Sequence, residues 1–144
     1  MDAVVNFFLQ PLVVVSITGI RSSGKQTLAT MLMDILRPHM DVEIRHTRHY
    51  ARPTIRAGCV IVIGPEDEWM WTQEYPVTIK VFVDCDRDLA LCRRVLAGGP
   101  IDELFAEEND VARLWRASAD VIIPNNAAGI SNMALESLAA FVRM

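Results

Sequence analysis

LVVVSITGIRSSGKQTLATMLMDIL, residues 12–36, places an apolar run, a glycine-containing loop and a helical pattern in direct succession. The short, continuous apolar run from Leu12 to Thr18 predicts a strand that is buried on both faces. The apolar spacing from Gly24 to Leu36 predicts a helix, which must stop near Pro38 because proline cannot continue the hydrogen-bond ladder. This stretch therefore predicts a strand, a tight loop and a helix.

The loop has the pattern Gly-x4-Gly-Lys, from Gly19 to Lys25. Between a buried strand and a helix, this pattern is typical of a phosphate-binding loop, or P-loop. Its glycines let N–H groups point at a phosphate, and Lys25 reaches the β and γ phosphates of a nucleotide. We predict a site for ATP, with a structural glycine turn as the alternative. The predicted nucleotide-binding residues are Gly19, Arg21, Ser22, Ser23, Gly24, Lys25, Gln26 and Thr27.

Gln26 occupies the position where such loops normally carry a serine or threonine hydroxyl for Mg²⁺. Thr27 comes one place later and, on a helix, points about 100° away. We therefore expect Mg²⁺ to be held mainly by nucleotide phosphates and water. Gln26, Thr27 and Asp67 are secondary candidates for direct metal ligands.

Beyond this segment, apolar runs alternate with helical patterns, and no repeat or long linker divides the chain. The alternation predicts one α/β domain over residues 1–144, with a five-stranded parallel sheet and helices on both faces. Together with the Gly-x4-Gly-Lys loop, it predicts the P-loop NTPase fold. The further predicted strands are Val42–Ile44, Cys59–Ile63, Val77–Val83 and Val121–Ile123. The further predicted helices are Glu66–Glu74, Asp86–Leu96, Glu107–Ala117 and Ser131–Val142, the second capped by Asp84 or Asp86 and the last by Ser131 or Asn132.

Charge and cysteine content narrow the classes of function. The 14 basic and 18 acidic residues argue against a surface that binds nucleic acid as a whole, although a local basic patch stays open. Three cysteines without a Cys-x-x-Cys pair predict reduced thiols in the cytoplasm. The uncharged stretch from Ala3 to Thr18 is interrupted by Gln10 and Pro11 and is shorter than the roughly 18 residues of a membrane span, so we expect no membrane association.

The loop GIRSSGKQT resembles that of bacteriophage deoxynucleoside monophosphate kinases and animal phosphomevalonate kinase. The resemblance continues in CVIVIGPEDEWMWTQEY, in VTIKVFVDCDRDLALCRR and in the closing ENDVARLWRASADVIIPNNAAG, whose last part is also similar to the dephospho-coenzyme A kinases. It implies a P-loop kinase that transfers the γ-phosphoryl group of ATP to a phosphorylated small molecule.

Two departures from the family pattern concern catalysis. The third strand of the family usually ends in Asp-x-Arg, whereas here Ile63 is followed by Gly-Pro-Glu-Asp. The stretches that correspond to the acceptor-binding insertion and to the lid, Thr47 to Gly58 and Ala97 to Glu107, are short. We therefore expect a reduced lid and a reduced acceptor site, and the sequence supports nucleotide binding more strongly than catalysis.

A basic segment from Arg45 to Arg56 contains no acidic residue and follows the second predicted strand. It should lie at the carboxyl edge of the sheet, where doubly wound proteins bind ligands. Guanidinium groups hold phosphate or carboxylate through paired hydrogen bonds. We predict that the acceptor anion is bound here, with a solvated charged loop as the alternative. The candidate residues are Arg45, Arg48, Arg52 and Arg56.

Two further pairs complete the candidate site. Arg93 and Arg94 lie on the helix that leads to the lid in the resembling kinases, so together with Lys25 they are the catalytic candidates. Adjacent helical positions differ by about 100°, so we expect only one of the two arginines to face the site. Asn125 and Asn126 follow the last strand, where the resemblance implies backbone contacts to adenine; an ordinary asparagine turn is the alternative.

The leading hypothesis is a small phosphotransferase that uses ATP and Mg²⁺ and whose acceptor is a nucleoside or deoxynucleoside monophosphate or a similar compound. One alternative is a regulatory or structural module that binds nucleotide but has lost catalysis. A third possibility, a kinase that acts on nucleic acid, ranks lowest because Tyr50 is the only aromatic side chain in the basic segment. The oligomeric state stays open.

Overall fold

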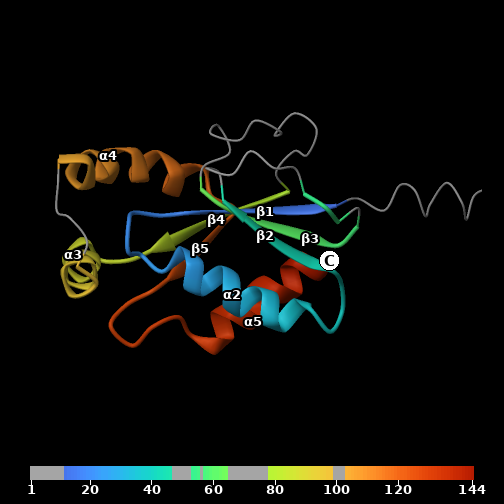
Figure 1. Cartoon of the computed structure of the whole chain (residues 1–144). Coiled ribbons are helices and arrows are strands. Elements are labelled where there is room, and N and C mark those ends of the chain that lie inside the picture. Colours follow the sequence, from blue (N-terminus) through green and yellow to red (C-terminus); the bar gives the residue numbers. More distant parts are fainter. Residues whose placement is uncertain (1–11, 47–52, 56, 65–77, 99–102) are drawn as a thin grey trace, which may run out of the picture.

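The computed structural model describes residues 12–46, 53–55, 57–64, 78–98 and 103–144. In this part of the chain a five-stranded, all-parallel sheet lies between helices (Figure 1). The predicted α/β class is confirmed. The strands are β1 (Val13–Thr18), β2 (Val42–His46), β3 (Cys59–Ile63), β4 (Ile79–Asp84) and β5 (Val121–Pro124), and the helices are α2 (Lys25–Leu36), α3 (Arg87–Leu96), α4 (Glu103–Ser118) and α5 (Asn132–Arg143).

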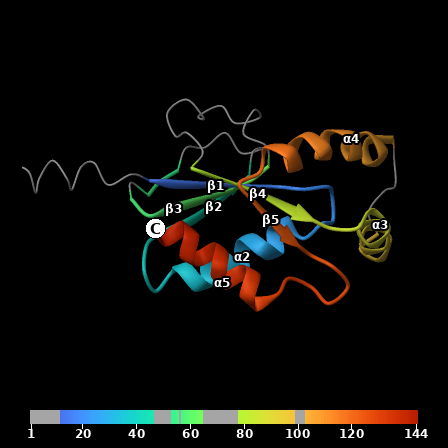
Figure 2. The same ribbon diagram turned by 180° about the vertical axis from the view of Figure 1, so that it is seen from behind.

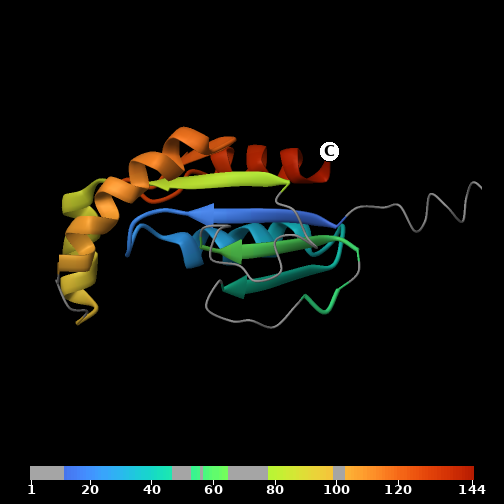
Figure 3. The ribbon, with the colours of Figure 1, turned by 90° about the horizontal axis from the view of Figure 1, so that it is seen from above.

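The strands are ordered β2-β3-β1-β4-β5, so β1 is central. Ser16 in the middle of β1 pairs with Val62 of β3 on one side and with Lys80 of β4 on the other. After β1 the chain continues toward β2, whereas after β4 it continues toward β5. The connections that leave β1 and β4 therefore run to opposite sides of the sheet, so the strand order reverses between these two neighbouring strands. Ligands of parallel sheets bind at the carboxyl edge beside such a reversal. Figure 3 shows this edge, with α3 lying across it.

Alternate side chains of the strands face opposite layers. One layer consists of α2 and α5, which lie side by side under one face of the sheet (Figure 2). Its core is formed by strand residues at every second position and by apolar residues of the two helices, among them Val15, Ile17, Ile61, Val81, Leu28, Leu32 and Leu138. Fully burying one such side chain stabilises the fold by about 1.5–3 kcal/mol.

On the opposite face, α4 packs against β4. Phe82 of β4 contacts a small cluster that includes Ala90 of α3 and Ala112 of α4, and Trp115 is packed against it. A second cluster on this face contains Val14, Val60 and Val62, with Leu12 and Ile55 packed against it. Helices thus lie on both faces, as predicted.

The edge strands differ from the sequence prediction that every strand is buried on both faces. β2 is half-buried along its whole length, and β5 has only Ile123 fully buried. Among the described strands, each of these two is paired on one side only, which fits their greater exposure. β2 is also longer than predicted, because Arg45 and His46 continue the ladder opposite Val62 and Ile63.

The observed start of α4 shortens the segment that we expected to form the lid. α4 begins at Glu103 rather than Glu107, so residues 103–107, which we expected in the lid, belong to a helix. The cap of α3 is Asp86, whose Oδ1 accepts a hydrogen bond of 2.8 Å from the Asp88 N–H. The cap of α5 is Ser131, which accepts one of 3.0 Å from the Ala134 N–H. The predicted helix Glu66–Glu74 lies outside the described residues.

Two simpler predictions can also be compared with the structure. Cys59, Cys85 and Cys92 are all free thiols, as expected, while the compartment stays a prediction. Among the helices that the structure describes, none combines the length and the apolar composition needed to cross a membrane.

Candidate functional site

The loop of residues 19–24 leaves the carboxyl end of β1 and leads directly into α2. Gly19 packs so closely against β4 that a Cβ there would lie 3.0 Å from the Val83 carbonyl oxygen. Ser22 has a φ of 61°, the only positive φ outside glycine in the described residues. Gly24 has a φ of 101° and provides no side-chain cap for α2. The cap position of α2 therefore has no side chain that accepts a hydrogen bond from the first N–H groups of the helix. Such N–H groups can donate to a bound anion instead.

Lys25, the first residue of α2, folds back over this loop. Its ammonium group donates hydrogen bonds to the carbonyl oxygens of Gly19, at 2.8 Å, and of Ile20, at 3.1 Å. The side chain is half-buried, and its charge adds to the partial positive charge of the helix N-terminus. The start of α2 and the ammonium group thus place positive charge beside the loop at the carboxyl end of β1.

Asn125 supports the loop from the far end of the sequence. The Asn125 side chain is buried, and its Nδ2 donates a 2.6 Å hydrogen bond to the carbonyl oxygen of Ser23. A Cβ on Gly24 would collide with the same amide nitrogen. We had expected Asn125 to contribute through its backbone, so the sequence analysis missed this side-chain contact. Its only sequence signal is the position of Asn125 directly after the last strand.

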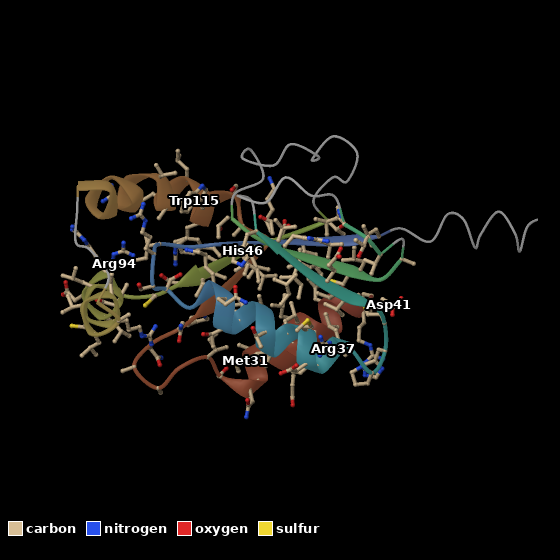
Figure 4. The ribbon with its side chains drawn as sticks, viewed as in Figure 1. Met31, Arg37, Asp41, His46, Arg94 and Trp115 are labelled. Atoms are coloured by element: carbon tan, nitrogen blue, oxygen red, sulfur yellow. The ribbon has the colours of Figure 1, made fainter. Side chains whose placement is uncertain are left out.

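Of the two arginines on α3, Arg93 is tied to the turn after β5. Its Nη2 donates to the Asn126 carbonyl oxygen at 3.3 Å, and its Nη1 donates to the Cys85 Sγ at 3.5 Å. Burial raises the pKa of the Cys85 thiol, and the charge of Arg93 opposes that effect. Figure 4 places Arg94 on α3 as well, at the end of the molecule where β4 finishes. Of the two predicted pairs, Arg93 and Asn126 are in contact at this edge.

The residues considered for Mg²⁺ are placed as follows. Gln26 and Thr27 are exposed in the first turn of α2, and the Gln26 Nε2 lies 3.4 Å from the Thr30 hydroxyl. No group of three or more histidine, cysteine, aspartate or glutamate side chains suited to a metal occurs among the described residues. Asp67 lies outside them.

Arg45 does not lie where the sequence analysis expected it. It belongs to β2, not to the following loop, and its Nη2 donates to the Glu43 Oε1 at 2.9 Å. Glu43 also accepts hydrogen bonds from the Thr54 N–H at 2.9 Å and the Thr54 hydroxyl at 2.6 Å. The pKa of Glu43 is lowered: burial opposes this, but the bonds from Thr54 and Arg45 outweigh it.

Arg45 is thus ion-paired to Glu43 within β2, and its role as a ligand for the acceptor stays a prediction. The sequence analysis had noted only that the stretch from Arg45 onward lacks acids, whereas the partner precedes it by two residues. Arg48, Arg52 and Arg56 lie outside the described residues.

The structure adds one carboxylate at the same sheet edge. Asp84 ends β4, and its Oδ2 lies 3.8 Å from the Arg116 Nη2, with both side chains about half exposed. An exposed pair at this separation contributes little to stability. The sequence analysis had considered Asp84 only as a helix cap, although a carboxylate at the carboxyl end of a central strand is itself a signal of a site.

Comparisons with known proteins identify the fold. No family model and no curated protein matches the sequence. Three solved structures superpose over nearly all of both chains: an uncharacterized protein from Eubacterium ventriosum (14% identity, TM-score 0.57, 91% of this chain and 98% of that one), TT1252 from Thermus thermophilus (12%, 0.60, 92% and 97%) and APE1195 (14%, 0.56, 94% and 96%). At these identities the similarity shows the fold alone.

Proposed function

We propose that residues 19–25 are a P-loop within a P-loop NTPase fold, and that the protein is a phosphotransferase that uses ATP. Its acceptor would be a nucleoside or deoxynucleoside monophosphate or a similar phosphorylated small molecule. The observation that carries this proposal is the loop at the carboxyl end of the central strand, with the Lys25 ammonium group folded over the Gly19 carbonyl. The resemblance of GIRSSGKQT to kinase loops supports the same conclusion.

The position of the loop supports the proposal independently of its sequence. It lies beside the chain reversal between β1 and β4, where parallel sheets bind ligands. The N-terminus of α2 and the Lys25 charge favour a polyanion there, and Arg93 and Arg94 are on the helix that lies across the same edge. These groups can bind and orient a triphosphate with its outer phosphate exposed toward an acceptor.

The reaction needs no nucleophile from the protein. An oxygen of the acceptor phosphate attacks the γ phosphorus, the bond from that phosphorus to the β–γ bridging oxygen breaks, and ADP leaves. Lys25 and the loop N–H groups would stabilise the negative charge that shifts during transfer. Mg²⁺, when bound, would neutralise phosphate charge. Gln26 and Thr27, both exposed in the first turn of α2, could contribute side-chain oxygens to it beside those of the nucleotide and water.

Gln26 favours a second candidate function, a nucleotide-binding module without catalysis. Its amide lies along α2 beside Thr30, and it offers no hydroxyl to a metal ion. The nucleic-acid alternative depends on the basic segment from Arg45 to Arg56. Arg45 is ion-paired to Glu43, and Arg48, Arg52 and Arg56 lie outside the described residues.

The test is a transfer assay with ATP, Mg²⁺ and each member of a panel of nucleoside and deoxynucleoside monophosphates, with products separated by chromatography. The wild-type protein should form ADP and a diphosphate with at least one acceptor, and Lys25→Ala should not. Lys80→Ala is the matched control, because Lys80 is the only other lysine and its backbone bond to Asp120 does not need the side chain. Binding of ATP without any product would support the module, and absence of ATP binding would overturn both functions.

A further inference from the structure

The contact between Asn125 and Ser23 joins two segments that are 102 residues apart in the chain. Asn125 is only 5% exposed, and the Ser23 carbonyl can only accept, so the amide nitrogen of Asn125 must face it. A buried carbonyl that lost its only donor would be left without compensation for its desolvation. The Ser23 N–H donates to the Ile20 carbonyl oxygen within the loop at 3.1 Å, and the Asn125 side chain supplies the contact that ties the Ser23 carbonyl to the rest of the fold.

The sheet in turn holds Asn125. Its backbone N–H donates a 2.8 Å hydrogen bond to the Asp84 carbonyl, which continues the ladder between β4 and β5 by one residue beyond Pro124. The adjacent carbonyl, that of Asn126, accepts a bond from Arg93 of α3. The backbone of Asn125 is thus bonded to β4, and the residue that follows it is bonded to α3.

Gly24 is fitted to the same amide. A Cβ at Gly24 would collide with the Asn125 Nδ2, and its φ of 101° is a conformation that side chains other than glycine rarely adopt. The second glycine of the loop therefore has two reasons to be glycine, its own backbone angle and the approach of Asn125. Loop and amide are complementary in shape as well as in hydrogen bonding.

We propose that Asn125 is a positioning residue: its buried amide holds residues 23–25 in the conformation that binds a triphosphate, so that the turn after β5 controls the affinity of the phosphate site. This inference rests on the proposed function, because it assumes that the loop binds phosphates. A positioning role is distinct from a contact between this turn and adenine, because the loss of affinity should also appear with a phosphate ligand that has no base.

The experiment measures binding of two probes, ATP and inorganic tripolyphosphate, by titration calorimetry at a temperature where each variant is folded. Asn125→Ala should weaken both probes by a similar factor, about tenfold, the size expected for an unsatisfied buried carbonyl. Asn125→Asp keeps the shape but replaces the donor with a carboxylate, so its loss should be larger. Asn132→Ala, an exposed asparagine at the start of α5, is the matched control and should bind both probes as the wild type does.

Each other outcome contradicts the proposal. A loss for ATP alone would assign Asn125 to the base, and a lower melting temperature with unchanged affinities would make it purely structural. If Gly24→Ala weakens tripolyphosphate equally in the wild-type and Asn125→Ala backgrounds, the two residues are not coupled, whereas we expect a smaller effect in the second background.

Failure of the proposed function is distinguished by a measurement without ligand. Amide hydrogen exchange over residues 19–28 should be faster in Asn125→Ala than in the wild type, while residues 59–63 of β3 stay unchanged. If the wild-type protein binds neither probe but this exchange increases, the proposed function is wrong and Asn125 still positions the loop. Unchanged exchange overturns the positioning role itself.

Discussion

The hydroxyl of Ser23 fills the space beside Gly19 that a side chain at position 19 would need. A Cβ on Gly19 would lie 2.6 Å from the Ser23 Oγ and 3.0 Å from the Val83 carbonyl oxygen. The Ser23 side chain is fully buried, and its Oγ has no hydrogen-bond partner among the described residues. The loop thus closes on β4 at a distance that only glycine allows.

We therefore expect Gly19→Ala to destabilise the protein by about 1–3 kcal/mol, the usual cost of overpacking, because the Val83 backbone cannot move aside. Urea denaturation measures this. The control is Gly98→Ala at the end of α3, where φ is +75° but no atom lies within 4 Å of the added Cβ, so only the backbone strain is added. Equal losses in the two variants would contradict the packing argument.

Gln26→Ser should restore a hydroxyl at the position where P-loops usually bind Mg²⁺. Gln26 is exposed and makes only a long hydrogen bond to Thr30, so the fold should tolerate the change. We expect half-maximal phosphoryl transfer at a Mg²⁺ concentration several-fold lower than in the wild type. Gln26→Ala, which removes the amide without adding a hydroxyl, should show no such decrease, and a decrease in both variants would exclude metal binding by the new hydroxyl.

Burial raises the pKa of the Cys59 thiol from 9.0 to about 12. The unfolded chain therefore loses this proton first, and stability falls as the pH rises above 9.0. The free energy of unfolding should decrease by about 1.4 kcal/mol between pH 8 and pH 10 from this group alone. Cys59→Ala should remove that decrease, whereas Cys92→Ala, at an exposed position, should keep it; urea denaturation at both pH values is the measurement.

The contribution of Glu43 to stability depends on pH in the opposite sense to that of Cys59. Burial raises the pKa of Glu43, but the hydrogen bonds from Thr54 and Arg45 lower it by more. The stability it contributes is present above its unfolded pKa of about 4.5 and is lost as the pH falls through the native pKa. Glu43→Gln should cost about 1 kcal/mol at pH 7 and reduce the loss of stability between pH 5 and pH 3. Asp41→Asn, at an exposed position just before β2, should leave the acid-induced loss unchanged, and a wild-type profile in Glu43→Gln would refute the role of the cluster.

Much of the fold could be predicted because the deciding information is local. Leu12–Thr18 and Cys59–Ile63 are continuous apolar runs, and the alternation of such runs with helical patterns permits few arrangements other than a parallel sheet. The caps Asp86 and Ser131 were among the predicted candidates, since a cap depends on only a few adjacent residues. The predicted boundaries were less accurate for β2 and α4, where ladder pairing and helix propagation extend beyond the apolar pattern.

The sequence by itself determined the strand, the glycine-rich loop and the helix, because backbone sterics and apolar periodicity act over neighbouring residues. Only the tertiary structure decided that Glu43 neutralises Arg45, that Arg93 bonds to the turn at Asn126, and that Asn125 supports the loop at Ser23. The last two contacts depend on the order of the strands, which places β4 beside β1 and β5 beside β4. No local pattern encodes a hydrogen bond between residues 102 positions apart, because this bond forms only when the folded sheet brings Asn125 and Ser23 together.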